Sequence, residues 1–175
     1  MSKFKTKTLV ITSFLIALQI VFVRLLPIGS GSVRISFGFF PIAVAGMIFG
    51  PLGAGGVAIL ADILGMILFA RGETFFPLFT LTEFLYGVGF GLMLHKKDLS
   101  YPKLAIFVFL QYIFLNLIIN SLWLYFYNIL IVGRHEGYFV IFTSRLIASA
   151  INLPLQFVGI WILCKYLKKP LSKII

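Results

Sequence analysis

Six runs of apolar residues, separated by short polar or glycine- and proline-rich segments, dominate this sequence. A hydrocarbon core about 30 Å thick is crossed by about 20 helical residues. Each run therefore predicts a membrane-spanning helix, and the whole chain, 1–175, predicts a single domain. The second and third runs are short and separated by Gly50-Pro51-Leu52-Gly53, so one re-entrant hairpin is the alternative there. The predicted spans are 8–27, 36–49, 54–70, 79–94, 103–132 and 138–167.

The composition favours a membrane protein over a soluble one. Hydrophobic residues make up 61% of the chain and charged residues 11%, whereas a soluble domain has about 25% charged residues. A soluble fold of this length keeps roughly a third of its surface in water, which so apolar a chain cannot supply. The sequence predicts an all-α, polytopic membrane protein with six transmembrane helices.

The ten lysines fall into three clusters, one at each end of the chain and one between the fourth and fifth spans. Lysine-rich loops mark the cytoplasmic side, and only an even number of spans places all three clusters there. Both termini are therefore predicted to be cytoplasmic. The net charge of +10 reflects this topology and contact with anionic lipid, and no nucleic acid is expected as a partner. The clusters are Lys3, Lys5 and Lys7; Lys96, Lys97 and Lys103; and Lys165, Lys168, Lys169 and Lys173.

None of the five arginines lies with the lysines. Arg34, Arg71 and Arg134 occupy predicted outer loops, Arg24 lies near the outer end of the first span, and Arg145 lies inside the last span. A guanidinium group forms paired hydrogen bonds with carboxylates, so these arginines could capture a carboxylate-bearing solute. Snorkelling to the outer interface is the alternative explanation, and the sequence favours neither.

Polar side chains follow one face of each of the last two spans. Such groups are costly in hydrocarbon, whereas amides could bond the edge of a flat heteroaromatic ring while aromatic side chains cover its face. Each amide could instead join two helices, and a pocket role is predicted mainly for Asn120 and Asn152. The two faces carry Asn116, Asn120, Trp123 and Tyr127, and Arg145, Ser149, Asn152 and Gln156.

Two acids and one pair of small residues complete the candidate positions. Glu83 lies about one turn from the outer end of its span and is predicted to face a ligand, whereas Asp62 is predicted to be structural. Ser13 and Ala17, on the cytoplasmic half of the first span, allow close helix contact either inside the bundle or with another subunit.

Missing motifs disfavour other functions. No G-x-x-x-x-G-K-[ST] motif is present, so ATP is not bound by that device. Cys164 is the only cysteine, and neither a metal site nor a cofactor is expected. His95 and His135 lie in loops on opposite predicted sides, which leaves a buried serine without a base. A stand-alone channel or carrier remains an alternative, although no inverted repeat is visible.

Several stretches of the sequence resemble a known transporter family. They are Arg34-Ile-Ser-Phe-Gly-Phe-Phe-Pro41 with Gly50-Pro51-Leu52-Gly53, then Asp62-Ile-Leu-Gly65, then Phe75-Phe76-Pro77 with Phe79-Thr80-Leu81-Thr82. Together they resemble the substrate-binding (S) components of energy-coupling-factor (ECF) transporters, in the folate-specific branch. The resemblance implies a multi-pass protein of the bacterial plasma membrane that binds folate and works with a transmembrane coupling subunit and two ATPase subunits.

The resemblance also implies roles for individual residues. Arg34 matches an outer-loop arginine of the family, and Asn152 matches an asparagine of its last helix. Ser13 and Ala17 match a small-x-x-x-small surface that contacts the coupling subunit. Leu78 replaces the usual glycine and Glu83 is not typical of the family, so an S component for another vitamin or small heteroaromatic solute is the alternative.

The residue pattern and the resemblance predict one arrangement of bound folate. The flat pterin ring would lie near the amides and aromatics, and the glutamate tail would meet arginines. The predicted substrate-binding residues are Arg34, Glu83, Asn120, Trp123, Tyr127, Arg145 and Asn152, with Arg71 or Arg134 as further candidates for the tail.

Overall fold

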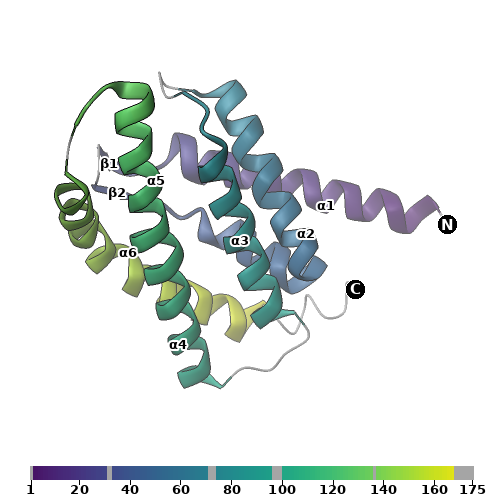
Figure 1. The fold of residues 1–175 in the computed structure, drawn as a ribbon. Helices are drawn as coiled ribbons and strands as arrows, with labels where there is room; N and C mark the ends of the chain where they lie inside the picture. Colours follow the sequence, from purple (N-terminus) through teal and green to yellow (C-terminus); the bar gives the residue numbers. More distant parts are fainter. Residues whose placement is uncertain (1, 31–32, 71–73, 96–99, 136, 168–175) are drawn as a thin grey trace.

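The computed structural model describes residues 2–30, 33–70, 74–95, 100–135 and 137–167, without the side chains of 2–5, 29–30 and 33–34. Five of the ten lysines and Arg71, together with the side chains of Lys3, Lys5 and Arg34, therefore lie outside what is described. Almost all of the described chain is helical (Figure 1). The helices are α1 (Ser2–Ile20), η1 (Val21–Leu25), α2 (Phe39–Leu68), α3 (Pro77–Leu94), α4 (Tyr101–Gln111), η2 (Tyr112–Ile119), α5 (Asn120–Tyr127), η3 (Asn128–Val132) and α6 (Tyr138–Tyr166).

Five of these described helical stretches are long and apolar enough to cross a membrane. Four match predicted spans, because η1 continues α1 and because α4, η2, α5 and η3 form one continuous rod, 101–132. The fifth, α2, contains both the second and the third predicted spans. Its first half, 39–49, reaches only about 16 Å at 1.5 Å per residue, about half of the hydrocarbon thickness. Among the described residues, the six predicted spans therefore correspond to five long helices.

A sharp kink divides α2 at the predicted turn. Gly50 has φ 73° and ψ −166°, a backbone conformation that only glycine adopts without strain. Pro51 follows and cannot donate the helical hydrogen bond. The turn expected over Gly50–Gly53 is therefore concentrated at one residue, and Figure 1 shows the ribbon changing direction within α2.

The kink returns the chain to the end of the bundle from which α2 began. A β-carbon placed on Gly38, just before α2, would contact Val23, and one placed on Gly65, near the end of α2, would lie beside Arg24. Both glycines therefore lie at the same end of α1. At the opposite end of α2's first half, His95 Nδ1 lies 3.1 Å from the carbonyl oxygen of Met47.

A short β-hairpin departs from the all-helical prediction. Ile28–Ser30 (β1) pairs antiparallel with Val33–Ile35 (β2), in the segment expected to be a glycine- and serine-rich loop. Backbone pairing satisfies peptide groups that would otherwise need water. The hairpin directs the chain from η1 into α2.

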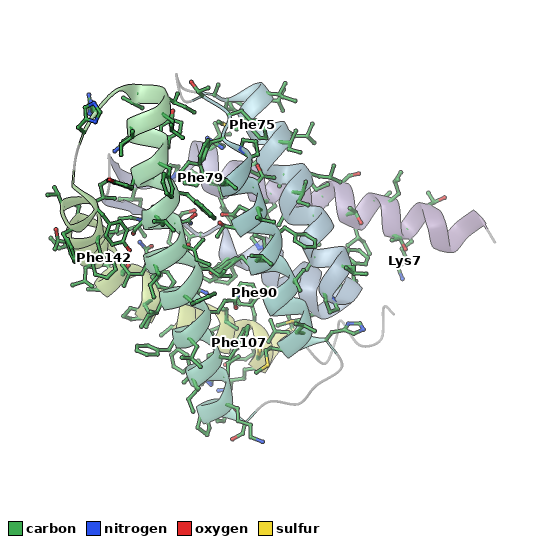
Figure 2. The ribbon with its side chains drawn as sticks, in the orientation of Figure 1. Lys7, Phe75, Phe79, Phe90, Phe107 and Phe142 are labelled. Carbon is green, nitrogen blue, oxygen red and sulfur yellow. The ribbon has the colours of Figure 1, made fainter. Side chains whose placement is uncertain are left out.

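The hydrophobic core lies where α2, α3, α4 and α6 meet. Phe90 is fully buried, with its ring 6.1 Å from that of Phe107 in α4. Figure 2 shows both side chains between the helices, whereas Lys7 lies on the part of α1 that projects beyond them. The packing leaves polar side chains of several helices facing one another at the other end of α3.

Candidate functional site

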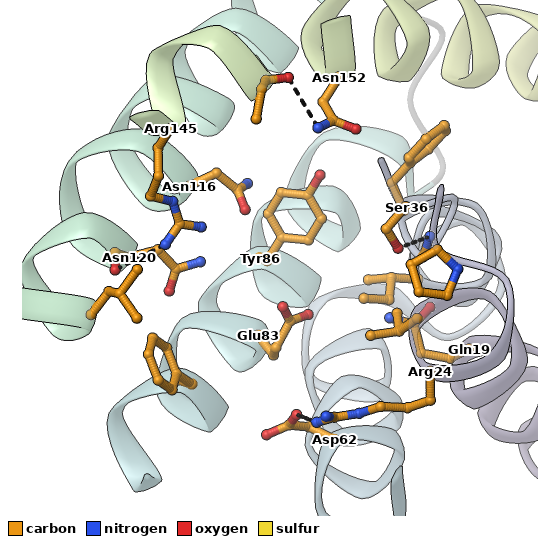
Figure 3. A pocket seen from close by; sticks show the side chains of 18 of the residues that line it. Gln19, Arg24, Ser36, Asp62, Glu83, Tyr86, Asn116, Asn120, Arg145 and Asn152 are labelled. Atoms are coloured by element: carbon orange, nitrogen blue, oxygen red, sulfur yellow. Dashed lines mark hydrogen bonds and ion pairs between the residues drawn. The ribbon is translucent and has the colours of Figure 1, made fainter. Parts of the chain in front are cut away.

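A cavity of about 440 Å³ lies between α1, η1, α2, α3, the 101–132 rod and α6. This volume falls in the range of about 300–1,000 Å³ that is typical of small-molecule sites. The cavity extends from the middle of the bundle to the segments at Pro27, Ser36 and 74–76, which join helices at one end. Figure 3 shows polar side chains converging on it from opposite walls.

The rod contributes Asn116, Asn120 and Tyr127 to the cavity wall, as its polar face predicted. Trp123 is not among the lining residues; its indole N–H donates a 3.1 Å hydrogen bond to the hydroxyl of Thr82 in α3. At about 100° per residue, Trp123 lies about 60° around the helix from Asn120, whereas Tyr127 lies within about 20°. The structure therefore brings Asn120 and Tyr127 together at the site and uses Trp123 to join α5 to α3.

The polar face of α6 lines the facing wall with four side chains. A guanidinium nitrogen of Arg145 donates to the backbone carbonyl of Asn120 over 3.2 Å, which joins the two walls. Asn152 donates its amide N–H to the carbonyl of Ala148 over 3.0 Å, and the Ser149 hydroxyl donates to the carbonyl of Arg145 over 2.8 Å. Gln156 is 2% exposed, and its amide nitrogen has no hydrogen-bond partner in the described chain.

A charged cluster forms the wall made by η1, α2 and α3. Arg24 donates to one oxygen of Asp62 over 3.5 Å, and the Thr80 hydroxyl donates to the other over 2.6 Å. Asp62 thus joins three helices, which is the structural role predicted for it. Glu83 lies beside this pair and also lines the cavity, and Figure 3 shows its carboxylate directed inward.

Aromatic side chains cover the end of the cavity near residues 74–76. The Tyr127 ring lies 5.8 Å from that of Phe76 and 6.0 Å from that of Phe79, in tilted arrangements that suit aromatic rings. The Tyr127 hydroxyl accepts a 3.1 Å hydrogen bond from the backbone N–H of Thr74. Tyr127 therefore connects α5 to the segment before α3 and provides an aromatic face to the cavity.

The remaining predicted residues are either exposed or outside the described part of the chain. Arg34 belongs to β2, but its side chain lies outside the described residues, as does all of Arg71. Arg134 is exposed after η3 and is not a lining residue. Ser13 and Ala17 are exposed on one side of α1, where no other described helix covers them.

Gln19, Tyr86 and Tyr112 are lining residues with polar side chains that were not identified from the sequence. Each had a readable signal. Gln19 is an isolated amide in an apolar span; Tyr86 lies three residues after Glu83, and Tyr112 four residues before Asn116, so each shares a helix face with a predicted site residue. Tyr86 and Tyr112 are both less than one-tenth exposed, and Figure 3 shows the Tyr86 ring at the centre of the site.

Comparisons with known proteins agree on one family. The family model for the substrate-specific component of ECF transporters matches residues 7–164. The chain is 36% identical over 157 residues to a folate transporter FolT of Clostridium novyi (strain NT), covering 90% of this chain and 87% of that protein. It is 29% identical over 161 residues to a folate transporter FolT of Leuconostoc mesenteroides, covering 90% of this chain and 84% of that protein.

A solved structure shows the same fold. The crystal structure of FolT bound with folic acid matches with a TM-score of 0.81 at 33% sequence identity, covering 91% of this chain and 93% of that one.

Proposed function

This chain belongs to the family of ECF transporter substrate-specific components, and from that premise we propose that it binds folate in the 440 Å³ cavity. The observation that carries the proposal is the match, over nine-tenths of the chain, to a FolT structure that holds folic acid. The walls of the cavity fit this ligand, because folate combines a flat, hydrogen-bonding pterin ring with a glutamate tail that bears two carboxylates.

We place the pterin ring between the amides of Asn120 and Asn152, with Tyr127 covering one face. The predicted contribution of Trp123 is better described as positioning, because its indole is bonded to Thr82 outside the cavity lining. Arg145 is the arginine on the amide-rich wall, and we assign it to a carboxylate of the tail. Arg34 stays a candidate for the second carboxylate on sequence grounds alone.

We propose six membrane crossings in one domain, with both termini in the cytoplasm. Gly38 and Gly65 lie beside Val23 and Arg24, whereas Gly50, between them in the chain, lies beside His95; the two halves of α2 therefore run in opposite directions, and we count them as two passes. The lysines at 7, 103 and 165 then fall on one side, as the positive-inside rule requires. Residue accessibility to a membrane-impermeant thiol reagent, measured on single-cysteine variants at positions 7 and 134, would test the two sides.

Uptake would require partners, since no ATP-binding motif is found in the sequence. We propose that a transmembrane coupling subunit and two ATPases act with this chain in a bacterial plasma membrane. Ser13 and Ala17 on the uncovered side of α1 form a small-residue surface on which another helix could pack closely.

The direct test is equilibrium binding of tritiated folate to the purified chain in nanodiscs. We expect saturable binding that unlabelled folate displaces. Absence of saturable binding in a folded, monodisperse preparation would contradict the proposed function. Displacement by another vitamin, but not by folate, would assign the chain to a different solute.

Replacing Arg145 by glutamine should weaken folate about tenfold to a hundredfold, because a charge-assisted hydrogen bond is worth about 1.5–3 kcal/mol. The affinity for pterin alone, which lacks the tail, should fall by less than about threefold. Competition against tritiated folate measures both. Arg134→Gln is the matched control, since that exposed arginine lies outside the cavity lining. Equal losses of folate and pterin in the Arg145 variant would remove the tail assignment.

A further inference from the structure

Unlike Arg24, Asp62 and Arg145, the other charged side chains described at the cavity, Glu83 has no hydrogen-bond partner among the described residues. It lies within α3, away from the helix ends, and is only partly buried. It lines both the main cavity and an adjoining cavity of about 30 Å³. Figure 3 shows its carboxylate pointing into the site, between Tyr86 and the Arg24–Asp62 pair.

The neighbouring acid is already engaged. One oxygen of Asp62 receives Arg24 and the other receives Thr80. Among the described residues, no hydrogen-bond donor reaches the carboxylate of Glu83, although Arg24 and Asp62 lie close enough to act on it electrostatically. A partly buried carboxylate that lacks hydrogen-bond donors is costly, so Glu83 is available to accept hydrogen bonds from a ligand that enters the cavity.

A second unpaired acceptor lies on the same wall. Gln19 is 5% exposed and lines both cavities, and its side-chain oxygen has no partner in the described chain. The small cavity between Gln19 and Glu83 has room for one water molecule by volume. This wall therefore offers two unpaired acceptors, whereas Arg145 on the opposite wall is a donor.

The chemistry of the carboxylate defines the ligand edge that fits it. An ionised carboxylate only accepts hydrogen bonds, and its two oxygens match two parallel N–H groups, as they do in a guanidinium pair. A 2-amino-4-oxo pteridine has such an edge, formed by the ring N3–H and the exocyclic amine. A 2,4-dioxo pteridine carries a carbonyl oxygen in place of the amine, so one acceptor of Glu83 would face another acceptor.

We propose that Glu83 is the specificity-determining residue of this site, and that it selects heteroaromatic rings carrying adjacent ring N–H and amino donors. This inference rests on the proposed folate-binding function and adds which edge of the ring the protein reads. The amides of Asn120 and Asn152 cannot supply this selection, because an amide can present either a donor or an acceptor.

The experiment compares pterin with lumazine, its 2,4-dioxo counterpart, as competitors of tritiated folate. The wild-type chain should prefer pterin by about tenfold to a hundredfold, because the wrong edge leaves a buried polar group unsatisfied. Glu83→Gln should weaken folate by a similar factor and bring the pterin-to-lumazine preference close to one. Ser144→Ala is the control, because Ser144 in α6 does not line the cavity. This substitution should change neither the affinity for folate nor the preference for pterin over lumazine.

The possible outcomes test the proposed function and the inference about Glu83 separately. Absence of folate binding by the wild-type chain contradicts the proposed function and this inference with it. Folate binding that is normal in wild type, combined with an unchanged ring preference in the Glu83→Gln variant, contradicts the inference alone. Should that variant fail to fold, Glu83→Asp retains the carboxylate and is expected to keep the preference at reduced affinity. A wild-type chain that binds folate but does not distinguish pterin from lumazine also contradicts the inference.

Discussion

Gly91→Ala should destabilise the folded protein by about 1–3 kcal/mol or more, and less folded protein should be recovered from membranes. A β-carbon at Gly91 would lie 2.3 Å from Cα of Pro51 and 2.5 Å from the carbonyl carbon of Gly50. These are backbone atoms of the α2 kink, so no side-chain rotation can relieve the overlap. Thermal unfolding in detergent, followed by tryptophan fluorescence, measures the effect.

Gly56→Ala is the matched control. Gly56 lies in α2, the helix against which α3 packs. A β-carbon at Gly56 has no atom within 4 Å, and alanine is favoured over glycine in a helix by about 1 kcal/mol. This variant should be as stable as the wild type or more stable. Wild-type stability of Gly91→Ala would show that α3 does not approach the kink this closely.

Asp62→Ala should cost about 3–5 kcal/mol of stability, because it removes the acidic partner of a buried guanidinium. The Arg24 side chain is 9% exposed and that of Asp62 is 16% exposed, so water cannot replace the lost interaction well. The effect should exceed that of Thr80→Val, which removes a single hydroxyl donor to Asp62. Chemical unfolding in a mixed-detergent series measures both variants.

The double variant Arg24→Met/Asp62→Leu separates the cost of breaking the ion pair from a loss of packing. Replacing both members of a buried ion pair by apolar residues is often close to neutral, so the double variant should be more stable than Asp62→Ala alone. A double variant that is less stable than Asp62→Ala would indicate that the pair is net stabilising. In either case the measurement shows whether the Arg24–Asp62 pair beside Glu83 stabilises the fold.

The sequence predicted most of the helices because their signal is local. A run of about 20 apolar residues identifies a spanning helix regardless of what packs on it, and 77–94, 101–132 and 138–166 were all anticipated within a few residues. The turn at Gly50–Gly53 was also anticipated, since Gly and Pro interrupt a helix locally. That the change of direction is concentrated at Gly50 was not evident from the sequence, which placed the turn over Gly50–Gly53.

The site was predicted in part. Asn120, Asn152, Tyr127, Arg145 and Glu83 all line the cavity, because polar residues in apolar spans must face the protein interior or a guest. Trp123 shared the same approximate spacing but lies turned toward α3. A spacing of three or four residues leaves an uncertainty of tens of degrees around the helix, and only the neighbouring helix decides which side chain faces the cavity.

By itself, the sequence determined that this chain is a helical membrane protein, where most of its helices lie, and which polar faces they carry. These properties depend on hydrophobicity and helical period, which each segment expresses without its neighbours. The tertiary structure decided that Asp62 is held by Arg24 and Thr80 while Glu83 is left facing the cavity. Two acids in apolar spans look alike in sequence, and only the donors brought from other helices distinguish the structural acid from the one available to a ligand.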